Sequence, residues 1–91
     1  METLLDLETE LVEDSTGRKY SARAVGAPRD HVWEGFVEFI PLDGGPALRT
    51  ERETTQPNRE DLLYWASGLE PVYLEGAFER AFVRATEDPS V

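Results

Sequence analysis

ERETTQPNREDLLYW, residues 51–65, marks the place where a polar strand is expected to stop and a helix to begin. Pro57 has no backbone N–H to donate to a neighbouring strand, so it ends the strand. Asn58 is a favoured helix N-cap, because its side-chain oxygen can accept a hydrogen bond from the N–H of Asp61. Glu60 and Asp61 fall in the first turn, where the helix dipole favours negative charge. The apolar positions of this helix follow at Leu62, Trp65, Ala66 and Leu69.

The C-terminal part of the chain is therefore predicted to form two helices, over residues 58–68 and 71–86. Gly68 is suited to end the first helix, and Pro71 is favoured in the first turn of the second. One apolar stripe at helical spacing runs along the second helix, at Leu74, Phe78, Ala81, Phe82 and Ala85.

Upstream, the segment VWEGFVEFI, residues 32–40, has the clearest strand pattern. Alternation places Trp33, Val37 and Phe39 on one face and Glu34, Phe36, Glu38 and Ile40 on the other. Gly35 lies on the first face, where the missing side chain leaves room for a helix to approach closely.

The segment PLDGGP, residues 41–46, has the composition of a hairpin loop. The chain is expected to return as a polar edge strand over residues 47–55, because charged side chains protect the edge of a sheet. The predicted register places Leu48 beside Phe39, Thr50 beside Val37 and Arg49 against Glu38. It also places Glu34 against Glu53, which is an unfavourable pair of like charges.

The first segment, residues 3–12, fits two structures. Leu5, Leu7 and Leu11 alternate with acidic residues, as in a strand, whereas Leu4, Leu7 and Leu11 suit one face of a helix. Residues 13–18 (EDSTGR) form a turn, and the following segment KYSARAVG, residues 19–26, reads as a strand. A hairpin that pairs Leu11 with Tyr20 would place Glu8 opposite Arg23 and Glu13 opposite Arg18. The segment GAPRDH, residues 26–31, is predicted to be a loop, because its glycine and proline interrupt a ladder.

These elements predict one α+β domain spanning residues 1–91. It consists of an antiparallel sheet of about four strands, formed by hairpins over residues 7–55, with the two C-terminal helices packed on one face as a two-layer sandwich.

Charge and composition exclude several classes of function. The chain has 9 basic and 19 acidic residues among its 91 and a formal net charge of −10, which disfavours binding to a phosphate backbone. It contains no cysteine, which excludes disulfides and thiolate chemistry. No apolar run has the length of a membrane span, and the acidic start does not resemble a signal peptide. The expected location is the cytoplasm.

Candidate catalytic groups are sparse. The only histidine, His31, stands beside Asp30 in a predicted loop and is interpreted as part of a surface pair. Metal sites require clusters of ligands at set spacings, and no such cluster is present. Glu51 and Glu53 share one side of a strand with Arg49, so a paired-carboxylate site is conceivable. No cofactor fingerprint accompanies them, and the sequence therefore predicts neither an enzyme nor a bound metal, cofactor or small molecule.

Apolar residues that the predicted fold leaves uncovered indicate a protein partner, either another protein or a second copy of the chain. They are Phe36 and Ile40 on the uncovered sheet face, and Val72, Gly76 and Val83 on the second helix. A basic and aromatic stripe on the same helix consists of Tyr73, Arg80 and Arg84. The expected function is a non-enzymatic interaction module that forms a homodimer.

An alternative function is an acidic inhibitor, antitoxin-like protein or nucleic-acid mimic that binds a basic partner. Its charge would come from the six acids among residues 1–14, namely Glu2, Asp6, Glu8, Glu10, Glu13 and Asp14. Residues 15–29 carry four basic residues and no acid, so part of this charge is expected to be neutralised within the chain.

Three segments resemble a group of short bacterial proteins of uncharacterised function: WEGFVEF (33–39), RETTQPNREDLLYWASGL (52–69) and YLEGAFERA (73–81). The resemblance spans residues 17–85 and leaves out the acidic first fourteen residues. It implies a bacterial origin and a self-contained domain, and it assigns no activity, cofactor or catalytic residue.

Overall fold

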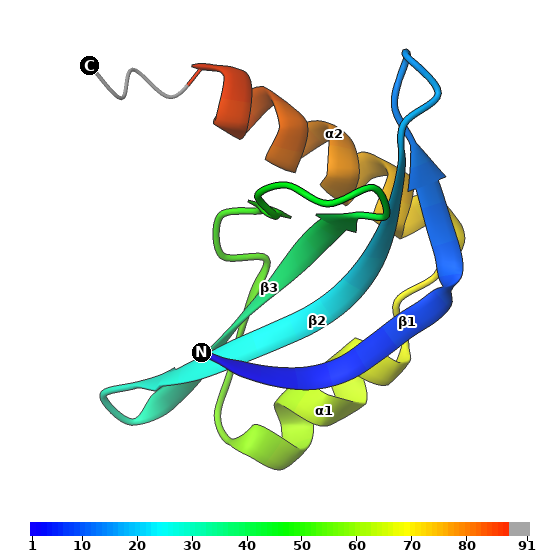
Figure 1. Cartoon of the computed structure of the whole chain (residues 1–91). Coiled ribbons are helices and arrows are strands. Elements are labelled where there is room, and N and C mark those ends of the chain that lie inside the picture. The colour runs from blue at the N-terminus through cyan, green and yellow to red at the C-terminus, as the bar shows by residue number, and fades with distance from the viewer. Residues whose placement is uncertain (88–91) are drawn as a thin grey trace.

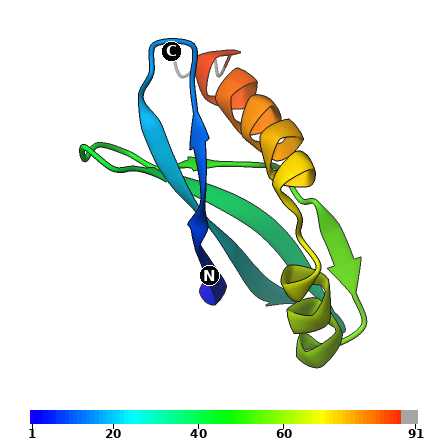
Figure 2. The ribbon, with the colours of Figure 1, turned by 90° about the vertical axis from the view of Figure 1, so that its right-hand side faces the viewer.

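Three long strands and two C-terminal helices dominate the structure, a computed structural model that describes residues 1–87, without the side chains of Glu8 and Glu87 (Figure 1). In chain order the elements are β1 (Glu2–Glu13), β2 (Lys19–Arg29), β3 (Val32–Pro41), β4 (Leu48–Arg49), β5 (Thr54–Gln56), α1 (Arg59–Ser67) and α2 (Pro71–Glu87). The five strands form one antiparallel sheet in the order β1-β2-β3-β4, and β5 also pairs with β3. Both helices lie on one side of this sheet (Figure 2). The α+β architecture is as predicted.

The first segment is a strand, which settles the choice between strand and helix for residues 3–12. β1 pairs with β2 through two irregularities, between Thr3 and Leu5 and between Leu7 and Leu11. Next to the turn the register differs by one residue from the prediction, so that Val12 lies opposite Tyr20 and Leu11 opposite Ser21. Beyond the irregularity at Leu7–Leu11 it differs by two residues in the other direction.

This shift changes the charged pairs of the hairpin. Arg23 lies opposite Asp6 rather than Glu8, whose side chain is outside the described part of the structure. Glu13 lies opposite Lys19. The predicted partner of Glu13, Arg18, instead forms an ion pair of 3.0 Å with Asp43 in the next loop.

The prediction of a loop over residues 26–31 was wrong, because β2 continues through Gly26 and Pro28 to Arg29. Only Asp30 and His31 form the turn, with Asp30 at a φ of 56°. In a two-residue hairpin the residues flanking the turn bond to each other, so the nitrogen of Pro28 points to the opposite side, toward β1. β1 begins opposite Gly26 and therefore leaves that position unpaired. Proline costs no hydrogen bond there.

The polar strand predicted over residues 47–55 is interrupted. Leu48 lies opposite Phe39 and Arg49 opposite Glu38, as predicted. The N–H of Thr50 donates to the carbonyl of Val37 (3.0 Å), and the Thr50 hydroxyl accepts from the Val37 N–H (3.1 Å).

Pairing resumes at β5, where Thr55 lies opposite Glu34. The predicted opposition of Glu34 and Glu53 is therefore wrong. Between β4 and β5 the N–H groups of Thr50 and Glu53 still donate to the Val37 and Gly35 carbonyls of β3. Glu51 and Arg52 bulge out between them, and the Glu53 side chain lies against α2.

α1 begins as predicted, with the N–H of Asp61 donating to the side chain of Asn58 (2.8 Å). Its Leu62 is fully buried on Gly26 and Gly35, which lie directly opposite each other in β2 and β3. A Cβ on Gly26 would stand 2.5 Å from Leu62 Cδ2, and one on Gly35 would stand 2.7 Å from Leu62 Cδ1. The two glycines thus form the seat on which α1 docks.

α2 closes the other half of the core. Phe78 packs its ring against Tyr20 and Phe39, with centroid distances of 4.9 and 5.2 Å. The remaining buried α2 positions are Leu74, Ala77 and Ala81. Along the described part of the chain, neither helix has the length and apolarity needed to cross a membrane.

Candidate functional site

The face of the sheet that carries no helix, called the open face below, presents its side chains in rows that run across the strands. One row consists of Leu11 on β1, Ser21 on β2 and Ile40 on β3, which lie opposite one another in the register. A second row places Val25 opposite Phe36. Phe36 and Ile40 thus lie on the uncovered face, where alternation along β3 puts them.

Leu11 belongs to this surface, although the sequence placed it elsewhere. Its side chain is 50 % exposed and lies opposite Ser21. The predicted register had paired Leu11 with Tyr20, which is a core residue. The irregularity between Leu7 and Leu11 moves Leu11 to the open face, and the alternation of the sequence carries no signal of it.

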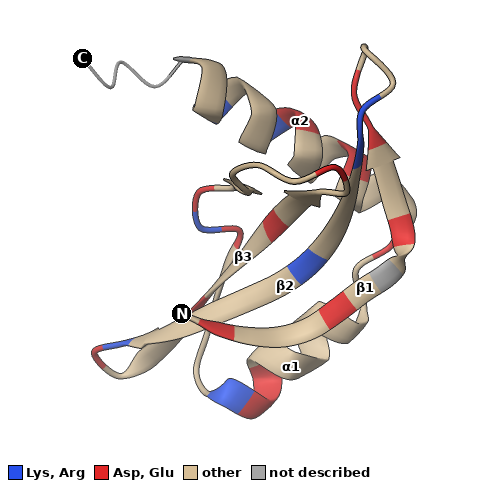
Figure 3. Cartoon of the chain, in the orientation of Figure 1, with Lys and Arg blue, Asp and Glu red and all other residues tan. Residues whose placement is uncertain are grey.

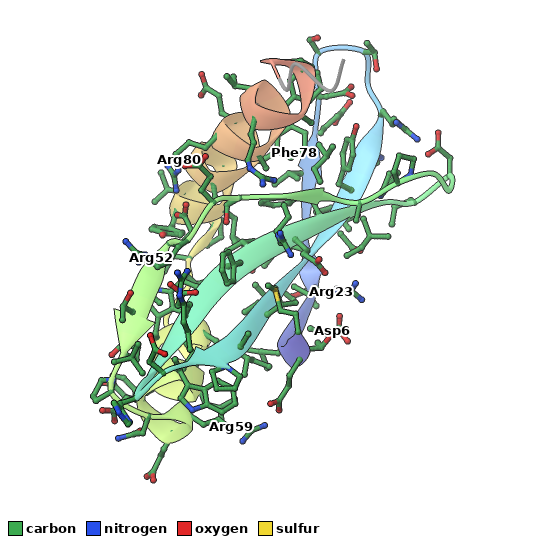
Figure 4. The ribbon with its side chains drawn as sticks, turned by 90° about the vertical axis from the view of Figure 1, so that its left-hand side faces the viewer. Asp6, Arg23, Arg52, Arg59, Phe78 and Arg80 are labelled. Atoms are coloured by element: carbon green, nitrogen blue, oxygen red, sulfur yellow. The ribbon has the colours of Figure 1, made fainter. Side chains whose placement is uncertain are left out.

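Between the two apolar rows runs a row of four charges, called the charge row, with one residue from each of the strands β1 to β4. It consists of Asp6, Arg23, Glu38 and Arg49, whose signs alternate. Figure 3 shows acidic and basic bands alternating across β1, β2 and β3, and Figure 4 shows Asp6 and Arg23 on the side of the sheet away from the helices. At the centre of the row, Arg23 Nε donates to Glu38 Oε1 (2.8 Å).

The two ends of the charge row have no carboxylate or guanidinium partner among the described side chains. Asp6 is exposed and makes no ion pair. The Arg49 guanidinium carbon stands 5.3 Å from the Phe36 ring centroid, and its Nη1 stands 3.6 Å from Met1 Sδ. Its Nε is buried and has no hydrogen-bond acceptor within the described structure. The row is therefore neutral at its centre and carries one unpaired charge of each sign at its ends.

A surface depression adjoins the Arg49 end of the row. It is lined by Glu38, Ala47, Leu48, Arg49, Arg84 and Ala85. Arg84 Nη1 donates to the carbonyl oxygen of Arg49 (3.2 Å) and, within the described part of the chain, meets no carboxylate. Glu38 is already bonded to Arg23. The depression is thus a place where two guanidinium groups can take an oxyanion, such as a carboxylate.

Glu53 is held in a separate cluster, the Glu53 clamp, which it forms with Tyr73 and Arg80 of α2. The Tyr73 hydroxyl donates to Glu53 Oε1 (2.5 Å), and Arg80 Nε donates to Glu53 Oε2 (3.3 Å), with a second bond from Arg80 Nη2. The Glu53 side chain is only 9 % exposed. Two of the three residues in the predicted basic and aromatic stripe are therefore engaged within the chain, and they fasten the 50–53 segment to α2.

The environment of the clamp alters the acidity of its groups. Burial, together with the hydrogen bond to Glu53, raises the pKa of the Tyr73 hydroxyl from 10.0 to about 12. The hydrogen bond to Glu53 also raises the pKa of Arg80. Burial disfavours the charged phenolate, and an ionised Tyr73 would also stand against the Glu53 carboxylate, so the Tyr73 proton is held more tightly.

Titration of tyrosine absorbance should show Tyr73 ionising near pH 12, and the step should be missing in Tyr73→Phe. In Glu53→Gln the pKa of Tyr73 should fall toward 10.0, because the neighbouring negative charge is removed. Since the pKa is raised on folding, the stabilisation by this hydroxyl is fully present below pH 10.0 and is lost as the pH rises toward about 12. A Tyr73 pKa equal to 10.0 in the parent chain would contradict the clamp geometry.

The predicted helix residues Val72 and Val83 lie far from Phe36 and Ile40. They are 74 % and 42 % exposed and project from the side of α2 opposite its buried residues. Because α2 covers the other face of the sheet, the apolar residues singled out in the sequence are divided between two opposite surfaces of the molecule (Figure 2).

Glu51, Glu53 and Arg49 are not brought together. Glu53 faces α2 in the clamp, whereas Arg49 lies over Phe36 on the open face. Glu51 is exposed, and no ion pair joins it to Arg49 among the described residues. Glu34 on β3 is held by Arg52 (3.3 Å) and Arg29 (3.8 Å).

Two acids of the N-terminal segment are used within the chain. Arg59 of α1 forms an ion pair with Glu2 and lowers the pKa of its carboxyl. Asp14 accepts from the Thr16 hydroxyl (2.6 Å), the Thr16 N–H (2.9 Å) and the Arg18 N–H (3.0 Å), and these bonds lower the pKa of Asp14. Glu2 thus links β1 to α1, and Asp14 stabilises the turn between β1 and β2.

His31 lies with Asp30 at the tip of the β2–β3 turn and is exposed. Within the described ranges, no three carboxylate, histidine or cysteine side chains gather into a group that could hold a metal ion.

Comparison of the chain with family models, with curated proteins and with solved structures found no match.

Proposed function

We propose that this chain is a small, non-enzymatic, cytoplasmic protein-interaction module that associates with a second copy of itself through the open face. The observation that carries the proposal is a sheet face with no helix on it, on which Leu11, Ile40 and Phe36 flank the charge row. Apolar side chains that are grouped on a surface favour association, and a domain of this size gains stability from it. Glu53 and Arg49, the strongest candidates for chemistry, make internal contacts instead.

Sedimentation equilibrium over a wide range of concentrations tests this proposal, and we expect a reversible monomer–dimer equilibrium. Ile40→Glu should weaken the dimer, because it places a charge in the apolar row of the open face. Val72→Glu is the matched control: it makes the same kind of change at a 74 % exposed position on the outer side of α2 and should leave association unchanged. Circular dichroism establishes that both variants fold. A single species of monomer mass at every concentration would refute the proposal.

The second candidate is an acidic protein that binds a basic partner. It is favoured by the position of β1 at the edge of the sheet, where its acids are accessible to another molecule. It is weakened by the engagement of Glu2 with Arg59 and of Asp14 in its turn, and by Lys19 opposite Glu13. Such binding would fall steeply with added salt, whereas apolar self-association would not.

A further inference from the structure

The unpaired ends of the charge row restrict how a second copy can sit on the open face. Asp6 stands at the β1 end and Arg49 at the β4 end, on the two outer strands of the path β1-β2-β3-β4. Arg23 and Glu38 are neutralised by each other between them. A partner that complements this row must therefore present a positive charge at one end and a negative charge at the other.

A second copy presents this arrangement when it is turned about a two-fold axis that runs along the strands, between β2 and β3. Such a rotation reverses the order of the row, so that Asp6 faces the partner's Arg49 and Arg23 faces the partner's Glu38. A two-fold axis along the row would instead place each charged residue opposite the identical residue of the partner, so that like charges would meet. An axis between β1 and β2 would leave Arg49 without a partner. Only the position between β2 and β3 uses both unpaired ends.

The apolar rows agree with the same axis. With the axis between β2 and β3, Ile40 faces the partner's Ser21, so a large side chain meets a small one. In the other row, Phe36, which lies half-buried beneath the Arg49 guanidinium, faces the partner's Val25, which is buried in its own chain, so two apolar positions oppose each other. These are the residues that already lie opposite each other between β2 and β3 within one chain. The β2 and β3 positions of both rows, together with the charge row, are thus compatible with this axis, whereas Leu11 on β1 has no counterpart on β4.

The depression beside Arg49 provides a place for the incoming carboxylate. Arg49 and Arg84 both line it, and neither has a carboxylate partner in the described part of the chain. The partner's Asp6 would bring a carboxylate to the Arg49 guanidinium at this edge, while the buried Nε itself stays out of its reach. By symmetry the contact occurs twice in the dimer.

We propose that two copies of the chain pack open face to open face about this axis, with Asp6 of each copy bound at the Arg49–Arg84 depression of the other. The inference rests on the proposed self-association and specifies its geometry. The apolar rows supply the affinity, and the charges at the row ends select the register and orientation, which is the usual contribution of ion pairs at the rim of an interface. The two sheets would be aligned, as in a β-sandwich.

Charge reversal at the two ends tests this geometry by sedimentation equilibrium at low ionic strength. Asp6→Arg converts both Asp6–Arg49 contacts of the dimer into repulsions between two arginines. Arg49→Asp converts both into repulsions between two aspartates. Each variant alone should raise the dimer dissociation constant by about tenfold or more, which corresponds to about 1.4 kcal/mol or more.

Mixing the two variants provides the decisive measurement. In a mixed dimer the new arginine at position 6 faces the new aspartate at position 49, and the native Arg49 of one copy faces the native Asp6 of the other. Both contacts are attractive, so the mixture should form heterodimers with an affinity close to that of the parent. The double variant Asp6→Arg/Arg49→Asp should likewise form homodimers of near-parent affinity. Glu79→Arg on the outer side of α2 makes the same change in net charge as Asp6→Arg and should leave the dissociation constant unchanged.

Two failures are distinguishable. A parent chain that dimerises with the same affinity as all of these variants would overturn this geometry and leave the proposed self-association standing. A parent chain that stays monomeric would overturn both. If Arg49→Asp loses its fold, as judged by circular dichroism, Arg49→Gln replaces it in the same measurements. Paired with Asp6→Asn, it must then show a coupling free energy in a double-mutant cycle, and additive effects would overturn the geometry.

Discussion

Replacing Leu62 with alanine should lower the free energy of unfolding by about 2–5 kcal/mol. The side chain is fully buried between α1 and the sheet, with its two methyl groups over Gly26 and Gly35. Neither glycine has a side chain that could move into the space left by the substitution. We therefore expect a loss near the upper end of this range. Urea unfolding followed by circular dichroism measures it.

For a domain of this size such a loss is a large fraction of the total stability, and the midpoint of thermal unfolding should fall by roughly 10 °C or more. Leu63, which is adjacent in α1 and only partly buried, provides a control, because Leu63→Ala removes the same atoms from a less covered position. Equal losses in the two variants would contradict the docking of α1 through Leu62.

Gly35→Ala should destabilise the protein by about 1–3 kcal/mol, although it adds only one methyl group. The new Cβ would stand 2.7 Å from Leu62 Cδ1, 2.8 Å from Thr54 Cγ2 and 2.9 Å from Trp65 Cζ3. Atoms on two elements, α1 and β5, must move to admit it, which separates α1 from β3. Gly76→Ala is the matched comparison and should stabilise the protein by up to about 1 kcal/mol, because alanine is favoured over glycine within a helix. Its Cβ would meet only the flexible end of Arg80, at 3.4 Å.

A double-mutant cycle links these two predictions. Once Leu62 is alanine, one of the three obstacles to a Cβ at position 35 is gone. The cost of Gly35→Ala should then be smaller in the Leu62→Ala background than in the parent chain, and the coupling should exceed the few tenths of a kcal/mol expected for independent sites. Additive losses would show that the glycine seat does not hold α1 as described.

The residues of the Glu53 clamp are recognisable in the sequence, but their contact with one another is not. Glu53, Tyr73 and Arg80 were each identified, but Glu53 was assigned to a conceivable catalytic pair and the other two to a partner surface. Their union depends on the bulge of Glu51 and Arg52 between two hydrogen bonds to β3, after which the Glu53 side chain lies against α2. Nothing in the local sequence signals that bulge. It begins after Thr50, whose N–H donates to the Val37 carbonyl and whose hydroxyl accepts from the Val37 N–H.

Features that depend on a few consecutive residues were determined by the sequence alone. Examples are the N-cap at Asn58, the start of α1 and the start of α2 at Pro71. They arise from hydrogen bonds and backbone restrictions within one turn, so a short segment of sequence is enough to predict them. The pairing of Leu48 with Phe39 and of Arg49 with Glu38 was also predicted, because the short connecting loop leaves few registers.

The tertiary structure decided the features in which the partner lies far along the chain. Pro28 stays within β2 because no residue of β1 pairs at that position and so no N–H donor is needed there. The irregularity before Leu11 shifts the charges of β1 against those of β2. Such outcomes depend on where a distant strand starts, ends or bulges, and a one-residue shift of register moves every following side chain to the other face. The core thus follows from local pattern, whereas the charge row and the open face exist only once the strands are assembled.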